Sequence, residues 1–402
     1  MVSLADIQNA ARIIQGKVLR TPLVYSPAFS EMTGSEIYLK LENLQTGGCF
    51  KVRGATSKVQ SHLAEIGSKG VIAASVGNHA QGVALAARAA NLPATIIMPV
   101  WASMAKQEAT RNYGAEVILK GISLVESIEI AQDMAARSGR TFIHPYDDPD
   151  IIAGQGTIAL EILEDAPDLD AIIVPVGGGG LIAGIAIAAK AISPKIRIIG
   201  VQARACPSAV EAIRQGHPVA VEEESSIADA IMVTQVGDSD FPVLRDYVDE
   251  IVLVDEDQIA AAVLMLLERK RILAEGAGAV PLAALLSPTH HLAKKSKVAL
   301  VISGGNVDSL LLDRILHKGL LMHGRLMRLH VDLKDSPDSL DRLLDLISRM
   351  QAGIVHIRHF HNERDLPVGC SRAELELETR GIDHIAKIAN ALNDAGYHID
   401  LK

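Results

Sequence analysis

Between residues 71 and 302, short β-branched strands alternate with alanine-rich helical stretches, and this alternation limits the fold more than any other feature of the chain. Residues 94–98, 116–119 and 196–201 are three of these strands. Strands that alternate with helices in this way form parallel sheets with helices on both faces. The sequence therefore predicts an α/β protein, although the alternation does not distinguish one sheet from two. In open sheets of this kind, ligands bind where the strands end.

Two strand ends carry unusual loops. The apolar strand 171–176 runs into four consecutive glycines, and an alanine-rich helix follows. Glycines between a strand and a helix let backbone N–H groups converge on an anion, at the helix end whose partial charge is positive. We therefore predict a phosphate site formed by Gly177, Gly178, Gly179, Gly180 and Leu181. The strand 71–75 likewise runs into a polar loop, residues 76–82, with the sequence VGNHAQG.

Lys51 is the candidate for covalent chemistry. It follows a glycine pair, stands next to Phe50 and precedes Arg53 by two positions. A lysine amine can form a Schiff base with an aldehyde cofactor, and a neighbouring flat side chain can cover the cofactor ring. On these residues alone, a surface lysine in a glycine-rich turn is the preferred interpretation, so the prediction depends on the other segments.

Taken together, these segments resemble the pyridoxal-phosphate enzymes of the tryptophan-synthase-β type (fold type II), and within them the threonine/serine dehydratases. The stretch CFKVRGA at 49–55 is similar to that family's cofactor-lysine motif, Ser-Phe-Lys-x-Arg-Gly-Ala. The further similar stretches are the substrate loop at 75–82, the phosphate loop at 177–181, the pyridine-nitrogen motif SGGN at 303–306, and the segments 153–157 and 275–279. The resemblance implies a tryptophan-synthase-β-like catalytic body at residues 1–320, with a smaller subdomain at about 50–145 inserted in the larger one and the cofactor, pyridoxal 5'-phosphate, between them.

The resemblance also implies a role for each matching residue. Lys51 would hold the cofactor as a Schiff base and then remove the α-proton of the substrate, with Phe50 against the ring. Asn78 would donate to the phenolic oxygen of the cofactor, and Ser303, with Gly304, would contact the ring nitrogen. The substrate carboxylate would be held by Ser75, Gly77, Asn78, His79 and Ala80, with His79 as an anchor and not an acid.

The implied reaction is the conversion of threonine to 2-oxobutanoate and ammonia, or of serine to pyruvate. Serine racemases of the same fold are the nearest rival. They need a second proton donor just before the Gly-Asn-His of the substrate loop, and Val76, which cannot transfer a proton, occupies that position. They also carry a divalent-metal site of acidic residues, and the comparable stretch here, residues 202–208, has no carboxylate. Both departures favour elimination, and no metal site is predicted.

The residues alone leave two further functional classes possible. Gly178, Gly180 and Ala183 fit a dinucleotide fingerprint, but the acidic residue expected about 20 positions later is missing. Arg204 in that region keeps a 2′-phosphorylated dinucleotide possible. A non-catalytic amino-acid sensor is the third class, and the intact Lys51, with its companion motifs, argues against it.

The last 80 or so residues have a different pattern. Residues 325–333, 354–357, 373–378 and 397–401 read as strands, and helical periodicity follows Pro337 and appears again near 382–395. This βαββαβ order is ferredoxin-like and resembles an ACT regulatory domain at 325–402. Asp338 stands where the ACT loop commonly has glycine, which argues against effector binding in the usual ACT mode. The alternative to an effector domain is a dimerising or merely stabilising appendage.

Bulk properties limit the partners. The net charge of −9, without a basic run, argues against nucleic acid. Three widely spaced cysteines indicate a reducing compartment, and we find neither a signal peptide nor an apolar run of the ~20 residues that cross a membrane. We therefore expect a cytoplasmic protein with no nucleic-acid or membrane partner, and the resemblance implies a small amino-acid substrate. The resemblance adds the expectation of a homo-oligomer, a dimer or a tetramer.

Overall fold

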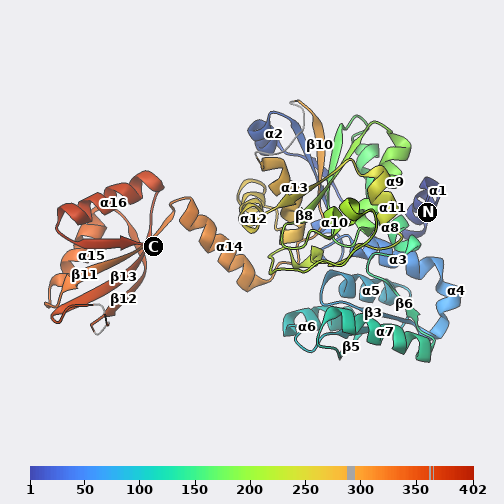
Figure 1. The fold of residues 1–402 in the computed structure, drawn as a ribbon, viewed down its shortest axis with the longest axis horizontal. Coiled ribbons are helices and arrows are strands. Elements are labelled where there is room, and N and C mark those ends of the chain that lie inside the picture. The colour runs from blue at the N-terminus through green and yellow to red at the C-terminus, as the bar shows by residue number, and fades with distance from the viewer. Residues whose placement is uncertain (288–294, 362–363, 365) are drawn as a thin grey trace. The chain divides into compact units, whose positions relative to one another are not determined.

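The computed structural model describes residues 1–287, 295–361, 364 and 366–402, which form two compact units, Met1–Val307 and Asp308–Lys402 (Figure 1). The division falls earlier than residue 320, because helix α14 (Ser309–Met322) groups with the second unit. The first unit contains two separate sheets, which answers the question that the sequence left open.

The larger sheet has six strands in the order β1-β2-β10-β7-β8-β9. Their bounds are β1 Leu23–Tyr25, β2 Glu36–Leu41, β10 Lys297–Ile302, β7 Ala171–Pro175, β8 Arg197–Ala203 and β9 Glu250–Val254. All neighbours are parallel except β1, which is antiparallel to β2 at the edge. The central strands β7 and β10 are almost wholly apolar because helices cover both faces of the sheet. The α/β class with parallel sheets is thus confirmed.

The helices of this part pack on the sheet and on one another. They are α1 Leu4–Ile14, α2 Pro27–Thr33, α8 Pro149–Asp165, α9 Gly180–Ile192, α10 Ser208–Gln215, α11 Phe241–Tyr247, α12 Glu256–Lys270 and α13 Gly276–Leu286, with 3-10 turns at Glu42–Leu44 and Asp229–Ile231. Helices α8 and α9 approach closely, since a methyl group on Gly184 would lie 2.5 Å from the backbone nitrogen of Gly156. The small residues of these two helices therefore set their spacing.

The smaller sheet has four parallel strands in the order β5-β4-β3-β6. Its strands are β3 Val71–Ala74, β4 Ala94–Met98, β5 Glu116–Leu119 and β6 Thr141–Phe142; the accompanying helices are α3 Lys51–Ser61, α4 Leu63–Ile66, α5 Asn78–Ala89, α6 Met104–Asn112 and α7 Leu124–Ser138, with a 3-10 turn at Gly67–Lys69. Strand β3 is buried throughout and ends three residues before α5, so the loop between them lies at the carboxyl edge of the sheet.

The second unit has the expected βαββαβ order, after α14. Its elements are β11 Leu326–Lys334, α15 Ser339–Arg349, β12 Gly353–Phe360, β13 Cys370–Glu378, α16 Ile382–Asp394 and β14 His398–Leu401. The strands form an antiparallel sheet in the order β12-β13-β11-β14. Apolar residues of α15 and α16 pack on β11 and β13 as a separate core. This unit therefore has its own hydrophobic interior.

Candidate active site

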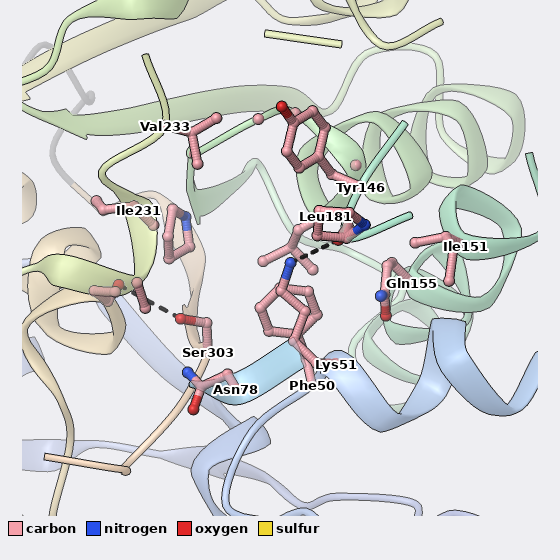
Figure 2. A pocket seen from close by; sticks show the side chains of 18 of the residues that line it. Phe50, Lys51, Asn78, Tyr146, Ile151, Gln155, Leu181, Ile231, Val233 and Ser303 are labelled. Carbon is pink, nitrogen blue, oxygen red and sulfur yellow. Dashed lines mark hydrogen bonds between the residues drawn. The ribbon is translucent and has the colours of Figure 1, made fainter. Parts of the chain in front are cut away.

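Three helices of the first unit begin at one cavity. Lys51 is the first residue of α3, Asn78 of α5 and Gly180 of α9, and all three residues line the cavity (Figure 2). No N-cap side chain bonds to the first turn of α5 or α9, so their backbone N–H groups remain available, whereas in α3 the Gly54 N–H donates to the Gln155 Oε1 at 3.2 Å. The positive ends of three helix dipoles thus meet at one place, which suits a ligand carrying a phosphate and a carboxylate.

The predicted residues divide into two groups. Those that line the cavity are Phe50, Lys51, Asn78, Gly177, Gly178, Gly179, Gly180, Leu181 and Ser303. Those that do not line it are Ser75, Gly77, His79, Ala80 and Gly304. Segments more than 250 residues apart in the chain therefore contribute to one cavity, at the carboxyl ends of strands from both sheets.

The amine of Lys51 extends into this cavity beside Phe50. Its Nζ lies 5.3 Å from the centroid of the Phe50 ring and donates to the carbonyl oxygen of Pro145 at 2.7 Å (Figure 2). Desolvation by the surrounding protein lowers the pKa of Lys51 to about 8, against the opposing fields of Asp240 and Glu275. Roughly a tenth of the amine is consequently uncharged at pH 7, far more than for a free lysine, and nucleophilic and basic catalysis both require this neutral form.

Arg53 fixes the helix that carries Lys51. The Arg53 guanidinium is fully buried and donates to both carboxylate oxygens of Glu42 at 2.8 Å. It also donates to Glu161 on α8, at 2.6 and 2.9 Å, and to the hydroxyl of Thr157. This planar fork between the buried Glu42 and the largely buried Glu161 holds the start of α3 against the 3-10 turn after β2 and against α8.

Asn78 is held in one orientation by a chain of hydrogen bonds. The Asn306 amide donates to the Asn78 Oδ1 at 2.8 Å, and the Asn78 Nδ2 donates to Glu275 at 2.7 Å. The Nδ2 group therefore points toward the cavity side and retains one further N–H to offer. Desolvation raises the pKa of Glu275 to about 7, with Asp229 adding to the shift. The cavity thus contains a carboxyl group that titrates near neutrality.

The glycine loop leaves no room for side chains. A methyl group on Gly178 would lie 2.5 Å from the Cδ2 atom of Tyr146, and one on Gly180 would lie 2.8 Å from the Tyr146 carbonyl oxygen. Gly179 has a φ of +117°, a conformation that side chains rarely adopt. Glycine is thus required for the backbone to curve around an anion beneath the Tyr146 ring.

Ser303 follows strand β10 directly and joins it to the Lys51 segment. Its carbonyl oxygen accepts the Phe50 backbone N–H at 3.1 Å, and its hydroxyl donates to the Ala277 carbonyl oxygen at 3.4 Å. Gly304 forms a backbone bridge with Cys49 instead of lining the cavity. The sheet edge and the lysine are therefore rigidly connected.

The loop after β3 is arranged around Asn78. The Ser75 hydroxyl accepts the Gly77 N–H at 3.1 Å, and the buried His79 ring pairs with the Ile143 carbonyl oxygen at 3.0 Å. Burial, with the Lys51 charge, lowers the pKa of His79 to about 3, so the ring stays neutral. Ala80 lies in the core of the smaller sheet.

Several residues at the cavity had no role in the sequence analysis. They are Pro145, Tyr146, Ile151, Gln155, Pro175, Ala230, Ile231, Val233, Glu275 and Ala277. Gln155 and Glu275 belong to two of the stretches that carry the family resemblance, and their place in those stretches could have marked them as site residues. Tyr146 had no such signal, because its place above the glycine loop depends on contacts between distant segments.

Within the described ranges of the chain, no cluster of three metal-binding side chains occurs, and no helix is both long and apolar enough to cross a bilayer. Gln202, in the stretch compared with the racemase metal site, is buried and is used structurally. Its amide accepts the Ala209 N–H at 2.9 Å and donates to the Ser208 hydroxyl at 3.3 Å.

Comparison with known families decides the identity of the cavity. Residues 14–304 match the family described as pyridoxal-phosphate dependent enzymes. The chain belongs to this family. Pyridoxal phosphate is therefore its cofactor, and the match spans every residue of the proposed site.

Individual members of the family agree with this assignment. An L-threonine ammonia-lyase from Thermotoga maritima is 46% identical over 99% of both chains. Among solved structures, the processed form of threonine deaminase isoform 2 from Solanum lycopersicum has a TM-score of 0.74 and 36% identity, over 79% of this chain and 87% of that one. Maize serine racemase has a TM-score of 0.75 and 36% identity, over 80% of this chain and 98% of that one.

The residues of this pyridoxal-phosphate enzyme fit the cofactor. Lys51 offers an amine of lowered pKa for the aldehyde, and the tightly curved glycine loop at the start of α9 offers N–H groups for the phosphate. The flat ring of Phe50 and the hydroxyl of Ser303 lie at the same cavity. The arrangement thus has a partner for the aldehyde, the phosphate and the ring.

Proposed function

We propose that this enzyme is a threonine ammonia-lyase that converts L-threonine to 2-oxobutanoate and ammonia, and that L-serine is a second substrate, giving pyruvate. The observation that carries the proposal is the full-length similarity to an enzyme named L-threonine ammonia-lyase. The geometry supports the same class of reaction, because an amine of lowered pKa lies beside a phosphate-type glycine loop. The bound cofactor supplies an electron sink that makes the Cα–H bond of the substrate acidic.

In this proposal the chain supplies proton transfer and orientation. Lys51 takes the α-proton, since its amine is already positioned in the cavity. The second N–H of Asn78 would donate to the phenolic oxygen of the bound cofactor, while Glu275 and Asn306 hold the amide in place. Ser303 offers a neutral hydroxyl to the ring nitrogen, which leaves the ring a weaker electron sink and favours loss of the β-hydroxyl.

The substrate carboxylate is proposed to bind at the start of α5. The uncapped first turn of this helix provides backbone N–H groups, with Ser75, Gly77, Asn78, His79 and Ala80 as the contributing segment. Since the His79 ring is neutral and pairs with a backbone carbonyl, its role is to anchor the loop.

Racemisation is the second candidate, because a serine racemase is among the similar structures. A racemase needs a proton donor on each face of the Cα atom. Val76 occupies the position that we compared with the second donor, and an isopropyl group cannot donate a proton. Elimination is therefore the preferred reaction.

The test is an assay of the purified protein with pyridoxal phosphate. L-threonine and L-serine are supplied in turn, 2-oxo acid and ammonia are quantified, and the chirality of the remaining amino acid is measured. We expect equal amounts of oxo acid and ammonia from threonine, and none with Lys51→Ala. Appearance of the D-enantiomer without oxo acid would instead support the racemase.

Regulation, assembly and location form a separate part of the proposal. The βαββαβ unit is proposed to be an ACT-like domain that binds an amino-acid effector or joins subunits, and the enzyme to be a cytoplasmic dimer or tetramer. The fold of that unit and its separate core support the first point. Light scattering of the purified protein, with and without candidate amino acids, tests the oligomeric state and whether an amino-acid effector changes it.

A further inference from the structure

Asp240 lies directly behind the phosphate loop. It precedes α11, and its side chain contacts Gly179, since a methyl group on that glycine would lie 2.7 Å from the Asp240 Cβ and 3.3 Å from its Oδ2. The turn that carries it is tied to the same loop, because the Gly237 N–H donates to the Gly178 carbonyl oxygen at 2.9 Å. A displacement of Asp240 would therefore be transmitted to the glycine loop.

The carboxyl of Asp240 is buried and unpaired. Its exposed fraction is 0%, and neither oxygen has a hydrogen-bond partner among the described residues. A buried ionised carboxylate without a partner is strongly disfavoured, so such a group retains its proton.

The charged groups around Asp240 shift its pKa in opposite directions. Burial and the Asp147 carboxylate raise the pKa of Asp240 well above its usual range, whereas the Lys51 ammonium opposes the shift. Tyr146 and the exposed Asp238 complete the titratable surroundings. A bound phosphate adds further negative charge nearby, which favours the protonated acid still more.

We propose that Asp240 is a positioning residue for the cofactor phosphate: it stays protonated while the phosphate is bound, and its ionisation weakens phosphate binding through the Gly179 backbone that it contacts. The Asp240 carboxyl thereby makes retention of the cofactor dependent on pH. The proposal rests on the cofactor of the family, not on the threonine activity, so the two can fail independently.

The direction in which pH changes the affinity for the cofactor follows from the charges of Asp240 and the phosphate. At low pH the neutral acid packs against the glycine loop without repelling the phosphate. As the pH rises through the pKa of Asp240, a carboxylate appears beside a phosphate dianion, and like charges in a poorly solvated site repel. Cofactor affinity should therefore decrease with rising pH.

The experiment uses full-length protein freed of cofactor. Pyridoxamine 5′-phosphate is titrated by fluorescence between about pH 6 and pH 9, because this ligand lacks the aldehyde and cannot link to Lys51. Pyridoxamine, which lacks the phosphate, is titrated in parallel, and Asp240→Asn is compared with wild type and with Asp238→Asn. The chemical shift of the bound phosphorus is recorded in the same samples.

The dissociation constant of pyridoxamine 5′-phosphate should rise with pH for wild type and for Asp238→Asn. We expect this increase to be at least about tenfold larger than the increase for Asp240→Asn. Pyridoxamine should show no such difference. Equal pH profiles for wild type and Asp240→Asn, or an effect of the same size with pyridoxamine, would overturn the proposal. If Asp240→Asn does not fold, Asp147→Asn takes its place: removing the Asp147 carboxylate should lower the pKa of Asp240 and move the loss of pyridoxamine 5′-phosphate affinity to lower pH, and an unshifted profile would overturn the proposal.

Discussion

Glu275 is a cavity residue whose protonation links the stability of the protein to pH. Its carboxylate accepts the Asn78 amide and has a pKa raised to about 7 by desolvation. The folded protein thus binds the Glu275 proton more tightly than the unfolded chain. Because the pKa is raised, the stabilisation is fully present below the unfolded pKa and is lost as the pH rises through about 7.

The variant Glu275→Gln should remove this dependence, because glutamine keeps an acceptor for Asn78 but cannot ionise. Between about pH 5 and pH 8, wild type should lose up to about 3 kcal/mol of unfolding free energy relative to this variant. Denaturant unfolding of the cofactor-free protein at both pH values measures the difference. The exposed carboxylate of α2, in Glu31→Gln, is the control and should follow wild type; parallel curves for Glu275→Gln and wild type would contradict the assignment.

At the scale of elements, helix α3 is positioned by a buried charge network and not by capping. Phe50 provides no side-chain cap, whereas Arg53 bonds to Glu42, in the 3-10 turn after β2, and to Glu161 on α8. Such a network orients Lys51, since the two residues share the first turn of the helix.

The variant Arg53→Met should therefore be costly. It leaves the buried Glu42 and the nearly buried Glu161 partly uncompensated, and breaking a buried pair costs about 3–5 kcal/mol. We expect a large fall in melting temperature and a weaker affinity for pyridoxal phosphate. The exposed i,i+4 pair of Arg137 with Asp133 supplies the control, since Arg137→Met should change the melting temperature little. Similar losses in both variants would mean that the buried network has no special role.

The conformation of the glycine loop also depends on the Tyr146 ring that packs against it. Because a methyl group on Gly178 would overlap the Tyr146 ring, Gly178→Ala should displace the loop or the ring. We expect the affinity for pyridoxal phosphate to fall about tenfold or more. The double variant Gly178→Ala with Tyr146→Ala tests the cause, because removal of the ring should recover part of the loss. A double variant as weak as the sum of the single ones would place the defect elsewhere.

Elements with strong local patterns were predictable from the sequence. Strands β3, β4, β5 and β7 follow β-branched runs, and the βαββαβ unit follows its alternating and helical periodicities. The pairing of β2 with β10 was not predictable, because residues 36–41 and 297–302 meet only through the fold. Periodicity reports on a segment's own burial, and not on its neighbour in a sheet.

The same distinction holds for the site. Lys51, Asn78, the glycine loop and Ser303 lie in short motifs, and the structure brings all of them to one cavity, as the sequence analysis expected; their chemical roles stay predictions. Tyr146 and Asp240 contact the glycine loop from elsewhere in the chain, and no local pattern marks such residues. Sequence reasoning therefore predicted which motifs meet and missed the residues that pack against them.

At the scale of the whole molecule, the chain consists of two units with separate hydrophobic cores. The core of the second unit is formed by residues between Met327 and Leu392, and no residue of the first unit belongs to it. Every residue that lines the cofactor cavity lies before Val307. Folding and cofactor binding in the first unit should consequently not require the second.

We therefore expect a fragment of residues 1–307 to fold and to bind pyridoxal phosphate with an affinity within a few-fold of the full chain. Each unit buries its own apolar residues, and a core of that kind makes a domain stable by itself. Circular dichroism melting and the absorbance of the bound cofactor test the fragment, with residues 308–402 prepared as the matching partner. If the second unit regulates the enzyme, the fragment should also lose any response to amino-acid effectors while keeping its cofactor. An unfolded fragment 1–307 beside a folded fragment 308–402 would instead mean that the catalytic unit depends on its appendage for stability, which two separate cores do not predict.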